Sequence, residues 1–192
     1  MLRTILALAL TFVVGANPHT KTMTPEQLIK YVAPSVVRVS FVVGDETHVC
    51  TGFSVSATKG WILTAAHCVD KDNEMYVGSQ WGKVINQNEQ FAMLKVAPMS
   101  VPPLDIKPTL GEVGEQVIAF GWGHDIYTAL PRTIAQTLDG DLALDGVVLK
   151  GMSGGPIVNT KGLVVGLTQG IDVLGIACGS GEINDFIRST KP

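Results

Sequence analysis

Two short blocks of the chain hold the residue types that nucleophilic catalysis requires. His67 lies in the block TAAHC, and Ser153 lies in the block GMSGGP. A serine hydroxyl is a weak nucleophile at neutral pH, and it becomes reactive when an imidazole accepts its proton. The blocks therefore predict a Ser153 nucleophile with His67 as general base. The structural alternatives are a plain turn around Ser153 and a buried histidine at a strand end.

The glycines beside Ser153 predict a second component of the same chemistry. Glycine lets the backbone turn tightly, so the N–H groups of Gly151 and Ser153 can converge on one point. Two such donors form an oxyanion hole, which stabilises the charged oxygen of a tetrahedral intermediate. The predicted reaction class is acyl transfer.

Together, in this order and far apart, the two blocks resemble the histidine and serine blocks of trypsin-like serine proteases. The resemblance runs from about Thr24 to Ile187 and is strongest to the HtrA-type and short trypsin-like peptidases, through QLIKYVAPSVVRV and GIACGSGEINDFI. It implies an all-β fold of two six-stranded antiparallel barrels with short N- and C-terminal helices. It also implies a peptide or protein substrate. HtrA-type proteases often carry a PDZ domain, and we expect none in these residues.

The resemblance also indicates a departure at the third catalytic position. These proteases hold the imidazole with a buried Asp on the strand after the histidine, and that position aligns with Gln90. Glu89 is the alternative, although side chains alternate across a strand and Glu89 would then face away from His67. Asp72 and Asp105 are more distant candidates.

An amide at the acid position leaves two functions open. An acid-to-amide change in such a triad can lower kcat by about 10⁴-fold. The first hypothesis is a secreted serine endopeptidase that works through an acyl-enzyme with weakened activity. The alternative is a catalytically inactive relative that binds peptides or proteins.

Substrate contacts are also implied by the resemblance. The residue six before the nucleophile lies at the base of the S1 pocket, and here it is Val147, followed by Val148. Thr168 and Gly170 belong to the segment that pairs with substrate backbone, and Gly170 and Gly175 leave the pocket open. We expect small or medium apolar P1 residues. The alternative is that both valines simply pack in the second barrel.

The chain has three cysteines, and the resemblance pairs two of them. Cys50 and Cys68 flank the strands before the histidine, as the cysteines do in many secreted trypsin-like enzymes. Cys178 then stays free and buried. The alternative is that Cys50 and Cys68 are reduced and buried. Export to an oxidising compartment makes this alternative less favourable, because disulfides form there.

Other polar residues give weaker signals. Lys150 precedes the oxyanion block and either attracts an acidic substrate residue or is simply solvated. His124 follows Gly-Trp-Gly in a loop that borders the cleft or is merely exposed. None of His19, His48 and His124 has a second His or Cys at a spacing typical of zinc ligands, so we expect no metal and no cofactor.

The elements that position these residues follow from local patterns. Thr24-Pro25-Glu26-Gln27 is typical of a helix start, and Pro34 ends that helix. Residues 97–108, with four prolines, predict a linker between two halves, roughly 34–100 and 109–180. An amphipathic helix is expected at 182–188. The predicted strands are 36–43, 52–57, 61–65, 91–96, 116–120, 157–159 and 163–168.

The N-terminus and the composition predict the destination and the partners. Arg3, the apolar run 5–14 and Val-Gly-Ala ending at Ala16 predict a signal peptide over 1–16 and a single protease domain over 17–192. The run is too short for a stable membrane anchor, so the protein is expected to be secreted or periplasmic. A net charge of −3 argues against a nucleic-acid partner. The sequence does not give the oligomeric state.

Overall fold

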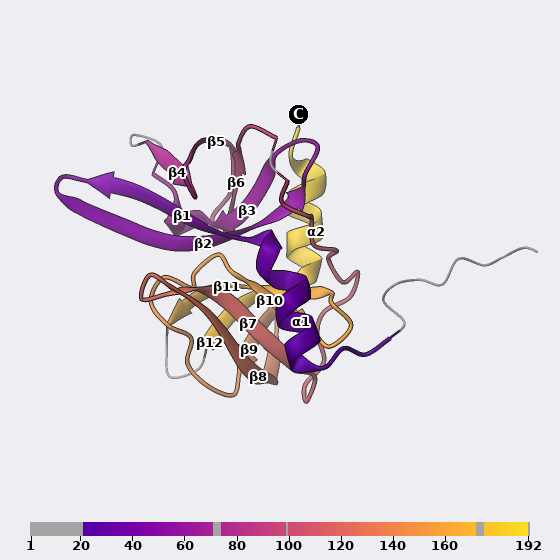
Figure 1. Ribbon diagram of the computed structural model, residues 1–192. Coiled ribbons are helices and arrows are strands. Elements are labelled where there is room, and N and C mark those ends of the chain that lie inside the picture. Colours follow the sequence, from indigo (N-terminus) through magenta and orange to yellow (C-terminus); the bar gives the residue numbers. More distant parts are fainter. Residues whose placement is uncertain (1–20, 71–73, 99, 172–174, 192) are drawn as a thin grey trace, which may run out of the picture.

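The strands form two barrels whose facing ends hold the predicted catalytic residues. The structure is a computed structural model, and it describes residues 21–70, 74–98, 100–171 and 175–191. In these ranges there are two closed six-stranded barrels, ordered β1-β2-β3-β6-β5-β4 and β10-β11-β12-β9-β8-β7, one above the other in Figure 1. The strand pairs within each barrel are antiparallel. The predicted fold class is confirmed.

The strands of each barrel follow one another along the chain. The first barrel comprises β1 (Val36–Val43), β2 (Glu46–Ser56), β3 (Trp61–Ala65), β4 (Met75–Val77), β5 (Gln80–Gln87) and β6 (Phe91–Lys95). The second comprises β7 (Gln116–Gly123), β8 (Ile126–Leu138), β9 (Asp141–Leu144), β10 (Pro156–Asn159), β11 (Val164–Ile171) and β12 (Gly175–Gly179). The strand patterns did not predict β4, β5, β8, β9 and β12. β5 and β8 are largely half-buried or exposed, so their sequences lack a clear apolar alternation.

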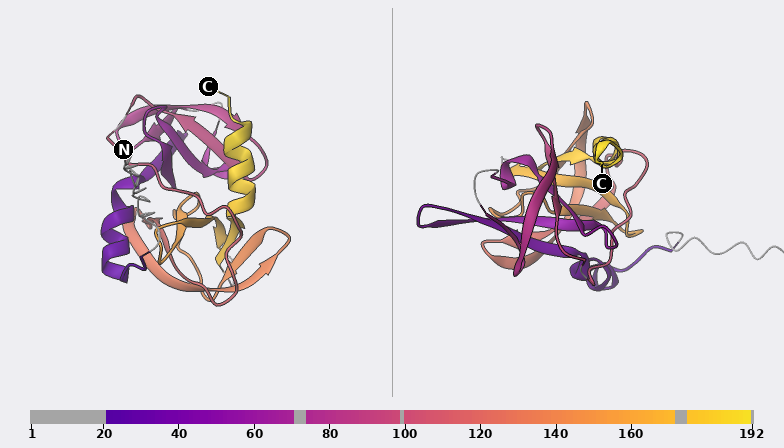
Figure 2. Two further views of the ribbon diagram at one scale, coloured as in Figure 1. Left: turned by 90° about the vertical axis from the view of Figure 1, so that its right-hand side faces the viewer. Right: turned by 90° about the horizontal axis from the view of Figure 1, so that it is seen from above.

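Two helices lie against the barrels, on opposite sides in the left view of Figure 2. α1 (Pro25–Val32) starts with the predicted capping box, in which Thr24 and Gln27 exchange hydrogen bonds of 3.0 and 3.3 Å. α2 (Ser180–Ser189) packs on the first barrel, where the rings of Phe186 and Phe91 are 5.5 Å apart. No helix among the described residues has the length and apolar character needed to span a bilayer. The predicted signal segment, residues 1–16, lies outside the described ranges.

The linker and a shared core fix the two barrels relative to each other. The Leu104 amide donates to the Ser54 carbonyl of the first barrel at 2.9 Å, and the Lys107 amide donates to the Val164 carbonyl of the second at 2.8 Å. The buried apolar cluster of the first barrel continues through Phe120 and Leu167 of the second. The loops that follow β3 and β9 are therefore held at one interface.

Candidate active site

Ser153 and His67 line one cavity between the two barrels. The cavity has a volume of about 380 Å³ and also reaches Gly151. His67 lies in the short 3-10 helix η3 (Ala66–Cys68) after β3, and Ser153 lies in the loop between β9 and β10. The Ser153 hydroxyl donates to the Gln169 carbonyl at 3.3 Å, and the described residues show no hydrogen bond between Ser153 and His67. The tertiary structure brings the two predicted residues to one site.

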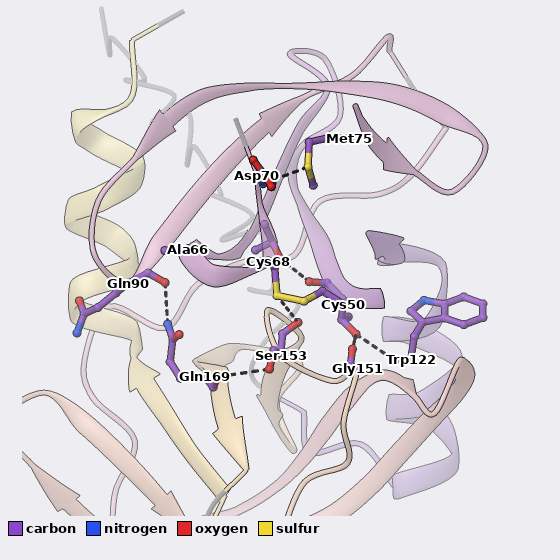
Figure 3. The surroundings of a disulfide bond; sticks show 12 residues. Cys50, Ala66, Cys68, Asp70, Met75, Gln90, Trp122, Gly151, Ser153 and Gln169 are labelled. Carbon is purple, nitrogen blue, oxygen red and sulfur yellow. Dashed lines mark hydrogen bonds between the residues drawn. A yellow bond between two sulfur atoms is a disulfide. The ribbon is translucent and has the colours of Figure 1, made fainter. Parts of the chain in front are cut away.

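The disulfide fixes the segment that carries His67. Cys50 on β2 is joined to Cys68 directly after His67, as expected, and Figure 3 shows this bond above Ser153. An imidazole nitrogen lies within 4.8 Å of the two sulfur atoms. Both sulfurs are consumed in the disulfide, so this cluster offers no thiolate to a metal ion.

The Gln90 side chain, which aligns with the catalytic acid, does not point toward the His67 ring as expected. The Gln90 side chain lies near Glu182 on α2, and Figure 3 shows it pointing toward that helix. Its backbone carbonyl accepts from the Ala66 amide at 2.9 Å and from Gln169 Nε2 at 2.8 Å. The Gln90 carboxamide therefore does not stand behind the His67 ring.

The local backbone explains why strand alternation failed at this position. Gln90 precedes β6, in a bend where Asn88 Oδ1 accepts from the amides of Gln90 at 2.9 Å and Phe91 at 2.7 Å. Glu89 is exposed in the same bend, and no contact joins it to His67 in the described residues. The Asp105 carbonyl accepts from the Val164 amide, and Asp72 lies outside the described ranges.

His67 has no carboxylate partner among the described residues. Its pKa is lowered from the ordinary value of 6.5, and the cause is desolvation by the surrounding protein. An acid in hydrogen-bond contact would instead raise the pKa, because it favours the charged imidazolium. The ring is therefore neutral at neutral pH and can accept a proton.

Two backbone amides at the nucleophile are available to an oxyanion. Within the described part of the chain, the N–H groups of Gly151 and Ser153 have no acceptor, whereas the next amide, of Gly154, donates to the Thr168 carbonyl at 2.7 Å. Gly151 has a φ of +96°, and a Cβ there would lie 2.4 Å from the Trp122 carbonyl oxygen. Only glycine fits this turn, and Gly151 and Ser153 both line the cavity.

Thr51 connects this loop to the first barrel, and the sequence analysis did not identify it. Its hydroxyl donates to the Gly151 carbonyl at 2.7 Å and accepts from the Trp122 amide at 2.8 Å. Its amide donates to the Ser153 carbonyl at 2.8 Å. Thr51 is fully buried. Because β2 also carries Thr47, Ser54 and Ser56, the sequence offered no signal that singled Thr51 out.

The predicted substrate contacts differ in exposure. The Val147 side chain is 45% exposed, whereas Val148 is 2% exposed and packs in the second barrel. Thr168 is buried, with its amide donating to Gly155. An added Cβ at Gly170 would meet open space, but at Gly175 it would lie 3.0 Å from the Gly146 carbonyl. Val147 and Gly170 thus remain accessible.

A second group of ligand-type side chains lies near Gln90. Asp141, Cys178 and Glu182 place their oxygen and sulfur atoms within 4.8 Å of one another. Burial and the neighbouring carboxylates raise the pKa of the Cys178 thiol to about 12. The thiol is thus protonated at neutral pH and is a poor metal ligand.

Comparison with known proteins gives the family. A family model described as a trypsin-like peptidase domain matches residues 50–167. The chain is 27% identical over 197 residues to Serine protease HTRA1B of Danio rerio, covering 85% of this chain and 40% of that protein. It is 30% identical over 142 residues to a probable periplasmic serine endoprotease, DegP-like, of Halomonas elongata, covering 63% and 29%. The chain thus spans less than half the length of these relatives.

Solved structures share the fold. The active form of the Rv3671c protease from M. tuberculosis has a TM-score of 0.78 at 20% identity, covering 99% of this chain and 96% of that one. A serine endoprotease from Yersinia pestis has a TM-score of 0.77 at 23% identity, covering 87% and 68%. With the family match over more than half of its length, the chain belongs to the trypsin-like peptidase family.

Proposed function

We propose that the protein is an exported serine endopeptidase that hydrolyses peptide bonds through an acyl-enzyme with low intrinsic activity. The main support is the arrangement at one cavity of the Ser153 hydroxyl, the neutral His67 ring and the acceptor-free amides of Gly151 and Ser153. These are the nucleophile, base and oxyanion donors of acyl transfer.

The proposed reaction begins when the Ser153 hydroxyl leaves the Gln169 carbonyl and donates to His67. As the serine oxygen bonds to the substrate carbonyl carbon, its proton passes to the imidazole, and the oxyanion accepts from the amides of Gly151 and Ser153. The imidazolium then protonates the departing amine, which leaves an ester on Ser153. Water, deprotonated by His67, hydrolyses that ester in the second half-reaction.

The low activity follows from what surrounds the imidazole. A carboxylate normally fixes the histidine tautomer and stabilises the imidazolium, and its replacement by an amide costs about 10⁴-fold in kcat. The Gln90 carboxamide points toward α2, near Glu182, and supplies neither effect. The proposed mechanism is thus a Ser153–His67 dyad.

Substrate binding is proposed along the exposed edge near β11. An extended peptide adds to a strand by main-chain hydrogen bonds. Gly170 presents no side chain to such a peptide, and the exposed Val147 offers an apolar contact for P1. We propose that Val147, Thr168, Gly170 and Gly175 border the site and favour small or medium apolar P1 residues.

Export is proposed on two observations. The segment 1–16 has the pattern of a signal peptide, and the Cys50–Cys68 disulfide requires an oxidising compartment in most organisms. The names of several relatives place those proteins in the periplasm. We propose the same class of location, secreted or periplasmic, for this chain.

Covalent labelling by a fluorophosphonate probe tests the proposed catalysis. We expect slow labelling of the oxidised protein, detected by mass, and none in Ser153→Ala. In Gln90→Asp the shorter side chain loses the Glu182 contact and is repelled by that carboxylate, so it should turn toward His67. Labelling should then accelerate by at least about 10-fold.

The same labelling experiment distinguishes the proposed peptidase from the alternative, a relative that binds peptides or proteins without catalysis. That alternative is favoured by the bond from Ser153 to Gln169 in place of His67. Absence of labelling in the folded protein, with labelling gained in Gln90→Asp, would support binding without catalysis. Labelling that persists in Ser153→Ala would contradict the assignment of Ser153 as nucleophile.

A further inference from the structure

The cavity at Ser153 reaches the β1–β2 hairpin, and charged and polar side chains share its lining with apolar ones. Beside His67, it is lined by His48 on β2, His124 in the β7–β8 turn and Lys150 before the oxyanion loop. All the histidines of the described residues thus border one cavity. None of these side chains belongs to the proposed S1 region around Val147 and Gly170.

The His48 ring is held in place by stacking. Phe41 and His48 are register partners across the β1–β2 hairpin, their ring centroids are 5.0 Å apart, and their planes differ by 9°. Stacking restricts the side-chain rotation of His48, so less conformational entropy is lost when its ring binds a ligand. An imidazole donates at least one N–H in either protonation state.

The backbone at His124 is strained, which points to a role for the side chain. A two-residue loop between paired Gly123 and Ile126 favours glycine or asparagine, yet His124 and Asp125 have φ values of 49° and 65°. Left-handed non-glycine residues of this kind carry backbone strain and cluster at functional sites. The His124 ring has no hydrogen-bond partner in the described chain.

Other contacts fix this turn without involving the Lys150 ammonium. Asp125 forms an ion pair of 2.6 Å with Arg38, which neutralises both. The His124 amide donates to the Lys150 carbonyl at 2.8 Å, so the two residues are neighbours. Lys150 forms no ion pair with a described residue. The other acid at the cavity is Glu46, which is exposed on β2.

We infer that this cavity binds an acidic side chain of the substrate on the leaving-group side of the scissile bond. The inference rests on the proposed function, because the imidazole that protonates the departing amine must face the leaving group. His67 lines this cavity, so the residues after the scissile bond enter it. The Lys150 ammonium and the N–H groups of His48 and His124 then bind the carboxylate. The substrate class is a peptide with Asp or Glu just after the cleaved bond.

Binding to Ser153→Ala tests this inference without any chemistry. Two fluorescent peptides share an apolar first half and carry either two Glu or two Gln in the second half. By fluorescence anisotropy the Glu peptide should bind at least about 5-fold more tightly at low salt. This preference should fall below about 2-fold in 0.5 M salt, which screens exposed charges.

Matched variants in the Ser153→Ala background identify the residues responsible. Lys150→Gln should abolish the preference for Glu, and His124→Asn should reduce it about 2-fold. Lys83→Gln removes the same charge from exposed β5, outside the cavity, and should leave the preference unchanged. Equal affinity for both peptides, an undiminished preference in Lys150→Gln, or no binding of either peptide at about 1 mM would overturn the inference.

Fluorophosphonate labelling separates this inference from the proposed function. Labelling at Ser153 with equal affinity for the two peptides would leave the peptidase proposal intact and remove the acidic specificity. Preference for the Glu peptide in a protein that never labels would remove the hydrolysis and leave an acidic-peptide binding site.

Discussion

At the residue scale, the environment of one imidazole determines the chemistry available. Desolvation lowers the pKa of His67, and the described residues provide no carboxylate to reverse the shift. His67 is therefore neutral at neutral pH and can accept a proton, but no carboxylate among the described residues stabilises its protonated form. In the proposed reaction, transition-state stabilisation therefore depends mainly on the amides of Gly151 and Ser153.

The pH dependence of labelling reports this environment. Labelling requires neutral His67, so its rate should rise with pH and level off, with a half-maximum below the ordinary histidine pKa of 6.5. In Gln90→Asp a carboxylate near the ring should shift that half-maximum upward. Pseudo-first-order labelling rates between about pH 4.5 and pH 8.5 measure both. A half-maximum above 7 in the unmodified protein would contradict the absence of an acid partner.

The free cysteine should be chemically inert in the folded protein. Burial and Asp141 raise the pKa of Cys178 to about 12, so at pH 8 only about one thiol in ten thousand is ionised. Iodoacetamide at pH 8 should leave the native protein unmodified and add one carbamidomethyl group in guanidinium chloride. Rapid modification of the native, oxidised protein would show that the thiol is accessible.

At the element scale, one strand of the first barrel supports the nucleophile loop of the second. β2 carries Cys50 toward His67 and Thr51 toward Gly151, so adjacent residues serve the two halves of the site. This placement depends on the close approach of β2 and β7, where the Trp122 amide donates to Thr51 at 2.8 Å. Thr51 is a positioning residue, since it acts through Gly151 and Ser153.

Substitution of Thr51 tests that role. Thr51→Val keeps the shape but leaves the Gly151 carbonyl and Trp122 amide unpaired, which should lower the free energy of unfolding by about 1–3 kcal/mol. Labelling should slow by about 10- to 100-fold at a temperature where the variant is folded. Thr51→Ser retains the hydroxyl and should label near the unmodified rate. Equal losses in both variants would indicate that packing of the methyl group, and not the hydrogen bonds, matters.

At the scale of the whole molecule, the two barrels behave as one body. The shared apolar cluster, the linker contacts and the packing of α2 on the first barrel all join them. Figures 1 and 2 show the terminal helices beside both barrels. Separation of the barrels would also separate His67 from Ser153, so the proposed activity should be lost when the barrels come apart.

Unfolding should therefore occur in a single transition. Trp61 lies in the first barrel and Trp122 in the second, so two variants that each keep one of these tryptophans, with Phe at the other tryptophan positions, report the barrels separately. Their fluorescence midpoints in urea should agree within about 0.2 M. Circular dichroism should follow the same curve. Two distinct midpoints would mean that each barrel unfolds independently.

The sequence by itself determined the features that depend on neighbouring residues. The capping box at Thr24, the strands 36–43 and 61–65 and the glycine turn around Ser153 follow from local backbone preferences. The barrel pair and the Cys50–Cys68 pairing were predicted through the resemblance. Strands such as β8 were missed because a half-exposed barrel strand has no strict apolar alternation.

The tertiary structure decided where distant side chains meet. Thr51 and Gly151 are 100 positions apart, and no local pattern predicts their hydrogen bond. The direction of Gln90 is set by Asn88 in the preceding bend and by Glu182 on α2, so alignment with a family position did not determine it. The walls of the cavity likewise come from β1, β2, η3, the β7–β8 turn and the loop between β9 and β10. Local sequence fixes backbone conformation, whereas packing between elements fixes side-chain direction, and here that direction separates a triad from a dyad.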